Sequence, residues 1–230
     1  MKKDIKVYLN KLSENWIVDR QRQEFLDSNK NLITNYLFRS NLIWIIAPWT
    51  WNKINKKYLE KNKVLCTIHH IDDEKIENEK TEFMKRDYFV NAYHVTNEST
   101  KRQLKKITKK DIYVEPFWVN SKYWFYIPNK NILKNKYNIN SESYVIGSFQ
   151  RDSEGYDVSI PKLSKGPDRL IEIINDFKKT KEDVHVVLTG KRRDYVIEEL
   201  KKLNINYSYF EMVNIANLNE LYNILDLYIV

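Results

Sequence analysis

The sequence predicts an α/β protein with two doubly wound parallel sheets, the second of them incomplete. Short apolar segments alternate with segments of helical spacing along most of the 230 residues, as is typical of strand–helix–strand units. The apolar segments have strand length and carry no polar face, as expected for parallel strands that helices cover on both sides. After Pro116 a region rich in aromatic residues and asparagine interrupts the alternation, which predicts a boundary between two units.

The first predicted unit covers residues 1–125. Apolar runs such as "LIWIIAP" and "VLCTIHH" are its strands, and Asn97 in "NEST" is a favoured N-cap residue for one of its helices. The expected strands are 5–9, 42–48, 64–70, 92–97 and 112–117, and the expected helices are 15–28, 52–62, 78–89 and 98–107.

Residues 126–142 are predicted to form a connector with a short helix, and residues 143–230 to form the second unit. The final apolar segment has no following turn or covering helix, so we expect the chain to be a fragment of a longer protein. One helix face follows the i, i+3, i+4, i+7 spacing at Leu170, Ile173, Ile174 and Phe177. The expected strands are 144–149, 184–190, 207–210 and 225–230, and the expected helices are 168–178, 196–203 and 217–223.

The composition is that of a soluble globular protein, with 42% hydrophobic and 30% charged residues. The one cysteine, Cys66, excludes a disulfide within the chain and fits a reducing compartment. The N-terminus lacks the apolar segment of a signal peptide, and the longest apolar run, "LIWIIAPW", is too short to span a bilayer. We therefore expect a cytoplasmic protein.

The net charge of +8 has two interpretations. It suits an anionic partner, such as nucleic acid, a phosphorylated small molecule or an acidic membrane face. It also follows from the abundance of lysine throughout the chain, in which case it carries no functional information. Because the basic residues are spread through both halves and no RNA- or DNA-binding motif is present, no nucleic acid is expected.

The segment 147–170 has the composition of a ligand-binding loop, with three of the four glycines and two of the five prolines. Arg151 closely follows one predicted strand, and Lys165 precedes a helix that Gly166 and Pro167 begin. Ligands of open parallel sheets bind beyond the carboxyl ends of strands, and a helix N-terminus favours an anion. The loop therefore indicates a phosphate or diphosphate site. The alternative is that Gly-Pro only starts a helix and both cations are solvated.

The order of the elements after this loop adds a resemblance to a known family. "YVIGSFQR", "KLSKGPDRLIEII", "VHVVLTG" and "IANLNELYNILDLYIV" together resemble the C-terminal, donor-binding domain of family 4-type retaining glycosyltransferases with the GT-B fold. The resemblance covers most of 144–230 and, more loosely, 64–128. It implies two Rossmann-like domains and a nucleoside-diphosphate sugar as the donor substrate, with no cofactor and no metal.

The resemblance also implies roles for single residues. Arg151 and Lys165 occupy the positions that hold the donor diphosphate in the family, with Gly147 and Gly166 beside them. The candidate nucleotide contacts are Gly190 and Lys191.

The sequence departs from the family's pattern in three places. The family's Glu-x7-Glu motif would lie beyond Val230, so we expect the chain to bind donor weakly and to turn over poorly or not at all. No glycine-rich loop follows the strand at 5–9, which puts acceptor contacts there in doubt. The segment 152–161 is longer than usual, and is either a mobile flap over the donor or a surface excursion.

"TIHHIDDEK" places His69 and His70 at the end of a predicted strand. A histidine there contacts the donor sugar in the enzymes that the sequence resembles, so both are candidate catalytic residues. A structural or surface pair is one alternative, and a metal site with Asp72 and Asp73 is another. Adjacent residues of an extended segment point in opposite directions and seldom share one ion, so no metal is expected. Residues 72–75 are expected to form a solvated helix start.

Other candidates have plainer interpretations. His94 is expected to be packed or hydrogen-bonded, and His185 to be structural within a strand. In "GKRRD", Arg192 or Arg193 is either a nucleotide contact or part of a charged helix start at the surface.

An aromatic and basic cluster lies in the first unit. Its rings either pack between strand and helix or rest on an anionic membrane with lysines on the headgroups. Its members are Trp44, Trp49, Trp51, Lys53, Lys56 and Lys57.

We therefore expect a hexosyl- or other glycosyltransferase of polysaccharide or glycoconjugate biosynthesis. Its acceptor would be a glycan, a lipid-linked molecule or a protein, and the enzyme would be cytoplasmic, with a peripheral position on the inner face of the membrane as one option. A sugar-nucleotide epimerase of the same fold, a basic nucleic-acid-binding module and a non-catalytic remnant are the alternatives.

Overall fold

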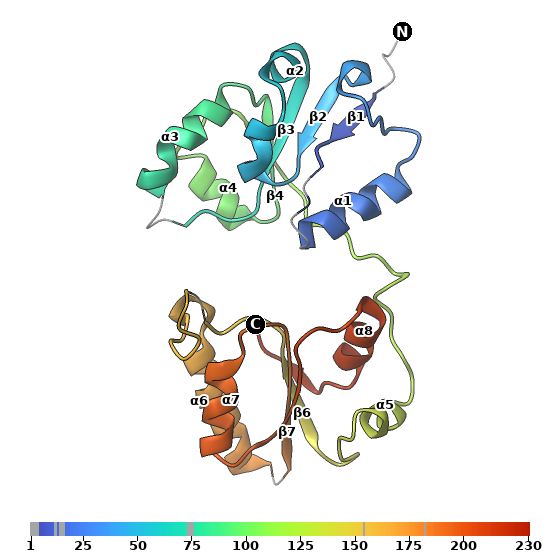
Figure 1. Cartoon of the computed structure of the whole chain (residues 1–230), viewed down its shortest axis with the longest axis vertical. Coiled ribbons are helices and arrows are strands. Elements are labelled where there is room, and N and C mark those ends of the chain that lie inside the picture. Colours follow the sequence, from blue (N-terminus) through green and yellow to red (C-terminus); the bar gives the residue numbers. More distant parts are fainter. Residues whose placement is uncertain (1–4, 12, 14–16, 73–75, 154, 182) are drawn as a thin grey trace. The chain divides into compact units, whose positions relative to one another are not determined.

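The computed structural model describes residues 5–11, 13, 17–72, 76–153, 155–181 and 183–230. The chain divides into two compact units, Met1–Val119 and Asn120–Val230 (Figure 1). The second unit includes residues 126–142, for which the sequence analysis predicts a separate connector. The division into 1–125, 126–142 and 143–230 stays a prediction. Within the described residues, no helix is both long enough and apolar enough to cross a bilayer.

The first unit contains a parallel sheet in the order β1-β2-β3-β4-β5. Helices cover both faces, with α3 and α4 on one and α1 on the other (Figure 1). The strands are β1 Val7–Leu9, β2 Leu42–Ile45, β3 Lys63–Ile68, β4 Ala92–Val95 and β5 Asp111–Val114. The helical elements are α1 Ile17–Ser28, η1 Leu37–Arg39, η2 Pro48–Lys53, α2 Lys56–Lys61, α3 Ile76–Asp87 and α4 Glu98–Leu104.

Strand β2 shows why its segment is apolar throughout. Ile43 and Ile45 belong to the core under α3 and α4, whereas Trp44 packs with Phe25 of α1 on the opposite face. Successive side chains of a strand point to opposite faces, so a sheet covered on both sides buries every position.

One predicted helix of this unit, 52–62, is divided in two. The chain first forms η2, which Pro48 begins, and then α2, which Asn55 caps by accepting a hydrogen bond from the Lys57 amide. Of the expected helix start at 72–75, residues 73–75 lie outside the described residues.

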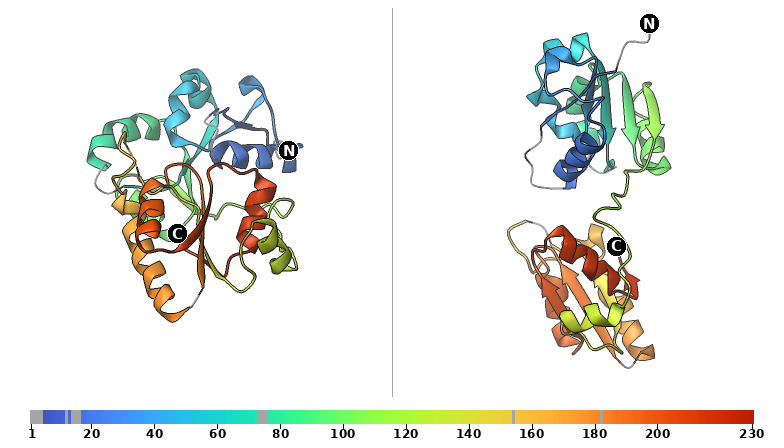
Figure 2. Two further views of the ribbon diagram at one scale, coloured as in Figure 1. Left: turned by 60° about the horizontal axis from the view of Figure 1, so that its bottom comes forward. Right: turned by 90° about the vertical axis from the view of Figure 1, so that its right-hand side faces the viewer.

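The second unit contains a parallel sheet in the order β8-β7-β6-β9. Helices α6 and α7 cover one face, and α5 and α8 lie side by side on the other (Figures 1 and 2). The strands are β6 Tyr144–Ser148, β7 Val184–Thr189, β8 Asn206–Phe210 and β9 Leu227–Tyr228. The helical elements are α5 Lys130–Lys136, η3 Leu163–Lys165, α6 Pro167–Thr180, α7 Asp194–Lys202 and α8 Ile215–Asn223.

Strand β6 repeats the pattern of β2. Ile146 packs under α6 and α7, whereas Val145 packs against α5 and α8. The predicted fold class, α/β with two doubly wound parallel sheets, is confirmed.

Candidate functional site

The loop after β6 leaves the sheet at its switch point. β6 pairs with β7 on one side and with β9 on the other, so the order of strands along the chain reverses at β6. The crevice beyond the carboxyl end of a strand at such a point is where open α/β sheets bind ligands. The segment that connects β6 to α6 contributes Gln150, Arg151, Asp152 and Lys165 to a hollow at this position.

Helix α6 begins at this crevice, and the first N–H groups of a helix have no partner within it. Its N-cap, Gly166, adopts the left-handed conformation, with φ 60° and ψ 38°, and has no side chain to cap them. Pro167 occupies the first helical position, where its missing N–H is no loss. The N–H groups of the first turn and the helix dipole together favour an anion at this end.

Arg151 and Lys165 line one hollow at this helix end. The hollow is shallow: its empty space of about 150 Å³ includes open solvent at the mouth, and it encloses no room for a water molecule. The side-chain amide of Gln150 donates a 3.1 Å hydrogen bond to the carbonyl oxygen of Lys165. This bond joins the segment after β6 to the segment before α6. Both cations are exposed to solvent, yet they share this hollow with Ser148 and Pro167.

The glycines and Lys191 are placed differently from these two cations. Gly147 lies within β6, and a Cβ there would overlap the side chain of Leu225, so its small size serves packing. Gly190 has φ +88° and its carbonyl accepts a 3.0 Å hydrogen bond from Tyr209. Gly147, Gly190 and the exposed Lys191 do not line the hollow, whereas Gly166 directly precedes Pro167, which does.

Arg193 is buried, which corrects the interpretation of "GKRRD" as a charged surface. Its side chain precedes α7, is 1% exposed and lines the same hollow as Arg151 and Lys165. Within the described residues, its Nε and Nη2 atoms have no hydrogen-bond partner. Burial lowers the pKa of Arg193, and the negative charge of Asp152 opposes this shift.

Asp152 explains why Arg193 is buried. Its carboxylate accepts a 2.9 Å hydrogen bond from the amide of Val196, in the first turn of α7, and its own amide donates to the carbonyl of Arg192 at 3.1 Å. These two bonds fix the start of α7 against the loop after β6. Lys191, Arg192 and Arg193 are adjacent cations that the sequence alone does not distinguish. The hydrogen bonds of Asp152, which is about 40 residues away in the chain, accompany the burial of Arg193.

The segment 152–161 is closed at its base. The amide of Lys162 donates to the carbonyl of Asp152 at 2.7 Å, and Ser153 forms an antiparallel bridge with Pro161. The side chains of Tyr156 and Ile160 beyond this base are exposed.

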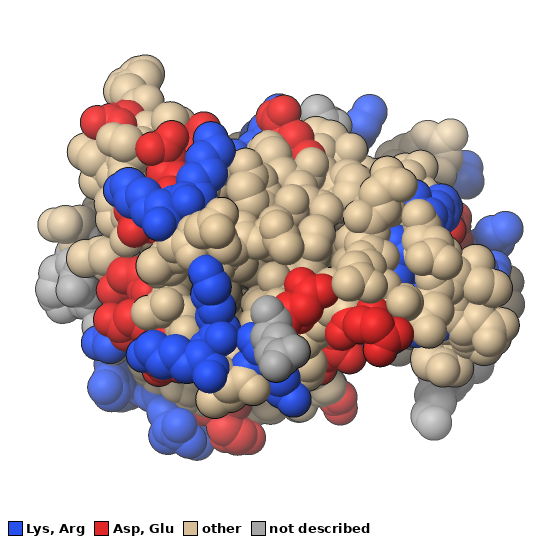
Figure 3. Space-filling model, turned by 90° about the horizontal axis from the view of Figure 1, so that it is seen from below, with Lys and Arg blue, Asp and Glu red and all other residues tan. Residues whose placement is uncertain are grey.

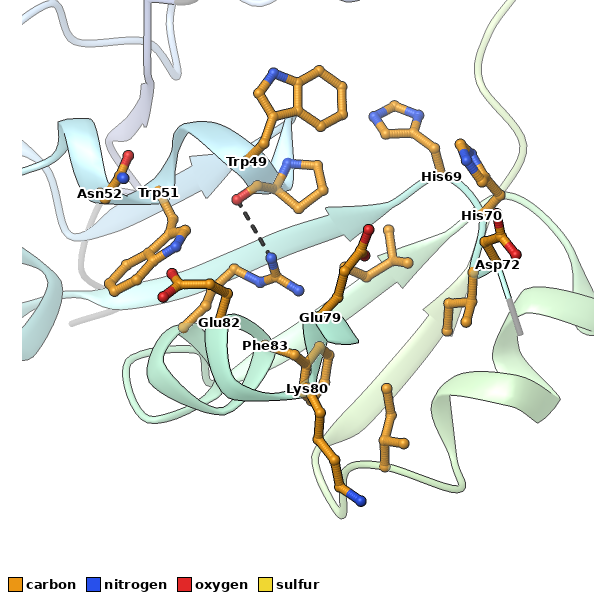
Figure 4. Close-up of a pocket in the computed structure, with 15 residues that line it drawn as sticks. Trp49, Trp51, Asn52, His69, His70, Asp72, Glu79, Lys80, Glu82 and Phe83 are labelled. Atoms are coloured by element: carbon orange, nitrogen blue, oxygen red, sulfur yellow. Dashed lines mark hydrogen bonds between the residues drawn. The ribbon is translucent and has the colours of Figure 1, made fainter. Parts of the chain in front are cut away.

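The first unit contains a cavity at the carboxyl end of β3, with about 430 Å³ of space that water molecules can enter (Figure 4). By the same measure the hollow beside α6 encloses none. Its walls come from the β3 end, from η2 and from α3. Figure 4 shows the carboxylate of Glu79 directed toward the strand end, and the ammonium of Lys80 directed away from the cavity. The lining side chains include Trp49, Trp51, His69, His70, Asp72, Glu79, Glu82 and Arg86.

His69 is held in one tautomer at the edge of this cavity. Its Nε2 lies 2.8 Å from the carbonyl oxygen of Ile46, which only accepts, so Nε2 carries the proton and the Nδ1 of the neutral ring does not. The ring stacks on Phe117, with centroids 5.6 Å apart. Burial lowers the pKa of His69, against the opposing effect of the Ile46 hydrogen bond, and so favours the neutral imidazole.

His70 is exposed on the same strand end and lines the cavity beside His69. Among the described residues, no three His, Cys, Asp or Glu side chains gather closely enough to hold a metal ion.

Helix α3 adds a cation that the sequence analysis did not identify. The Nη1 of Arg86 donates to the carbonyl of Pro48 at 3.5 Å (dashed in Figure 4), and its guanidinium lies 5.2 Å from the centre of the Phe83 ring. Its Nε is buried and, among the described residues, has no partner. The helical pattern identifies a covering helix, but it does not show that one end of that helix borders a cavity.

His94 belongs to a chain of hydrogen bonds across the sheet, as its structural interpretation requires. Trp44 Nε1 donates to Thr67 Oγ1 at 2.9 Å, and that hydroxyl lies 3.0 Å from His94 Nδ1. His94 Nε2 in turn lies 2.8 Å from the carbonyl oxygen of Glu115. His185, within β7, contacts the Ser208 hydroxyl at 2.9 Å.

The tryptophans of the aromatic and basic cluster are mostly packed. Trp44 and Trp51 are 9% and 6% exposed, whereas Trp49 is 44% exposed. Two of the three rings are therefore unavailable to a membrane surface.

Figure 3 shows one face of the molecule, on which Lys and Arg side chains are interspersed with Asp and Glu and with uncharged surface.

Comparisons with known proteins give no match by sequence, since no protein-family model and no curated protein matches the chain. Solved structures do match. HepE of Anabaena in complex with UDP and glucose matches with a TM-score of 0.68 and 11% identity, over 98% of this chain and 73% of that one. HepE structures with UDP-glucose and with UDP also match, with TM-scores of 0.63 and 0.64.

Two further structures have the same arrangement of elements. Sucrose-phosphate synthase of Thermosynechococcus elongatus matches with a TM-score of 0.62 and 12% identity, over 95% of this chain and 56% of that one. A glycosyltransferase of Rickettsia africae matches with a TM-score of 0.56 and 17% identity, over 95% and 57% of the two chains. The chain therefore has the GT-B fold, as the sequence analysis predicted.

Proposed function

We propose that the protein is a glycosyltransferase that takes its sugar from a nucleoside-diphosphate donor. The observation that carries this proposal is the hollow at the switch point, where Arg151 and Lys165 meet the uncapped start of α6. The complexes of HepE with UDP and with UDP-glucose, on the same fold, support a nucleotide sugar as the ligand class. The finer assignment, to the retaining family 4-type enzymes, rests on the sequence resemblance.

The hollow suits the charge that develops in glycosyl transfer. When the bond between the sugar and the diphosphate breaks, the electron pair stays with the departing diphosphate, whose negative charge rises. Arg151 presents a planar fork of N–H donors, and Lys165 a compact positive charge. With the amides of α6 they are already in place before charge develops, which is how electrostatic stabilisation lowers a barrier. Gly166 lies on the loop between β6 and α6, and Gly190 and Lys191 lie on the loop between β7 and α7. These three residues are the proposed neighbours of the nucleotide.

We assign the cavity of the first unit to a sugar. Trp49 offers an aromatic face, and the carboxylate of Glu79 offers acceptors for hydroxyl groups. His69 in its neutral tautomer accepts a hydrogen bond at Nδ1 because its Nε2 proton is already donated. His70, exposed beside it, is the second candidate for contact with the sugar. The acceptor is proposed to be a glycan, a lipid-linked molecule or a protein, and membrane contact would depend on the exposed Trp49 and nearby lysines.

The direct test is ligand binding by the 230-residue chain. Thermal melting is followed with UDP, GDP, uridine and inorganic pyrophosphate, since a ligand that binds only the folded state raises the melting temperature. We expect one nucleoside diphosphate and pyrophosphate to stabilise the protein, and uridine to have a much smaller effect. If none of the phosphate compounds changes the melting temperature, the proposal is wrong.

Product analysis then separates the two enzymatic alternatives. Incubation with the nucleotide sugar of the preferred base is expected to give free nucleoside diphosphate, by transfer or by slow hydrolysis. An isomerised sugar still attached to its diphosphate would instead identify an epimerase.

A further inference from the structure

The guanidinium of Arg193 is the least satisfied charged group at the candidate diphosphate site. Its side chain is 1% exposed, and its Nε and Nη2 atoms have no hydrogen-bond partner within the described residues. A buried charged group without partners is costly, because it has lost its hydration and gained nothing in exchange. An unsatisfied buried group in a native protein needs a partner, and a bound ligand can supply one.

The two unpaired atoms are the two that form one edge of a guanidinium. Nε–H and Nη2–H point in nearly the same direction, which is the geometry that grips two oxygens of one phosphate or carboxylate. Arg193 lines the hollow that Arg151 and Lys165 also line, at the start of α6.

Asp152 is the nearest candidate to neutralise Arg193 within the protein, and it does so only at a distance. Its negative charge raises the pKa of Arg193, against the larger effect of burial. Within the described residues these two side chains form no ion pair. Oδ2 of Asp152 accepts a hydrogen bond from the Val196 amide, and Oδ1 of Asp152 has no hydrogen-bond partner. The buried hydroxyl of Ser148 also lacks a partner and lines the same hollow.

We propose that Arg193 is a third cation of the diphosphate site and contacts a phosphate directly through its Nε and Nη2 edge. This inference rests on the proposed function, and it adds a buried contact to the two exposed ones. An ionic hydrogen bond in a buried position is screened less by water and salt than one at the surface. Arg193 therefore contributes more to diphosphate affinity than Arg151 or Lys165, although neither burial nor orientation is visible in its sequence context.

The test compares Arg193→Gln and Arg193→Lys with a matched control. Lys179→Gln removes a cation from the last turn of α6, where it pairs with Asp176 at 2.8 Å and does not line the hollow. Titration calorimetry at fixed ionic strength measures the affinity of the full chain for inorganic pyrophosphate, UDP and GDP. Melting temperatures without ligand report on folding.

We expect Arg193→Gln to weaken pyrophosphate binding by at least about tenfold, the scale of one lost charge-assisted pair. Arg193→Lys keeps the charge but not the two parallel N–H groups, and is expected to lose about threefold or more. Lys179→Gln is expected to bind as the unchanged protein does.

The possible outcomes separate this inference from the proposed function. If the unchanged protein binds pyrophosphate and a nucleoside diphosphate but Arg193→Gln binds them equally well, the role of Arg193 is refuted and the proposed function remains. If the unchanged protein binds none of them, both fall. If Arg193→Gln fails to fold, Arg193→Lys decides, because full pyrophosphate affinity in that variant refutes the two-donor contact.

Discussion

Gln150 donates a hydrogen bond from its side-chain amide to the carbonyl of Lys165, 3.1 Å away and fifteen residues later in the chain. This bond joins the segment that leaves β6 to the segment that enters α6. Arg151, adjacent to Gln150, and Lys165 therefore face the same hollow although each is exposed.

The first prediction concerns these two exposed cations. Arg151→Gln and Lys165→Gln are each expected to weaken pyrophosphate binding by about fivefold, a modest loss because exposed charges are screened. Both losses should shrink as salt concentration rises. Calorimetric titration at two ionic strengths measures this, with Lys179→Gln as the control, since Lys179 pairs with Asp176 on the outer surface of α6. Unaltered affinity in both variants would remove these residues from the site.

The second prediction separates packing from ligand binding at Gly147. Gly147→Ala places a methyl group against the side chain of Leu225, in a well-packed region, and is expected to cost about 1–3 kcal/mol of unfolding free energy. Leu225→Ala frees that space, so the double variant should lose less than the sum of the single losses. Urea unfolding of all four proteins measures the coupling. Strictly additive losses would show that the two residues do not compete for the same space.

The third prediction follows from the lowered pKa of His69. The unfolded imidazole binds a proton at a pH where the folded one does not, so the free energy of unfolding should fall as the pH drops below about 6.5. The fall should end once the pH is below the folded pKa. His69→Phe keeps a ring on Phe117 and removes this contribution, so its urea midpoint should vary less between pH 7 and pH 5. His185, whose pKa burial also lowers, contributes to the slope that remains. An equally steep profile in His69→Phe would contradict the assignment.

The fourth prediction compares two neighbouring tryptophans. Trp51 is packed in the core of the first unit, so Trp51→Ala is expected to cost about 3–5 kcal/mol. Trp49 is 44% exposed at the cavity, so Trp49→Ala should cost far less and should instead alter sugar binding. Thermal melting and titration with glucose distinguish the two effects. Similar losses of stability would contradict the different burial of the two rings.

The sequence predicted the elements of the fold because local pattern decides them. The run around Ile43 and Trp44 is apolar at every position since alternate side chains enter two different cores. Arg151 and Lys165 could be proposed as site residues for a similar reason, because each lies close to the end of a recognisable element.

The remainder of the site depends on contacts between distant residues. The hydrogen bond from the Val196 amide to Asp152 spans 44 residues, and it accompanies the burial of Arg193 beside cations of the same kind. Gly147 is small because of Leu225, which lies far away in the chain and was not part of the glycine-loop pattern. Tertiary packing sets such relationships, and no local spacing in the sequence reports them.

The hydrogen bonds from Trp44 through Thr67 and His94 to Glu115 run perpendicular to the strands and join β2, β3, β4 and the residue after β5. A one-residue slip of any of these strands would turn its member to the opposite face and leave buried donors unpaired. These hydrogen bonds thus add to the backbone ladder in fixing the register of the strands. They thereby fix where β3 ends, and with it the position of His69.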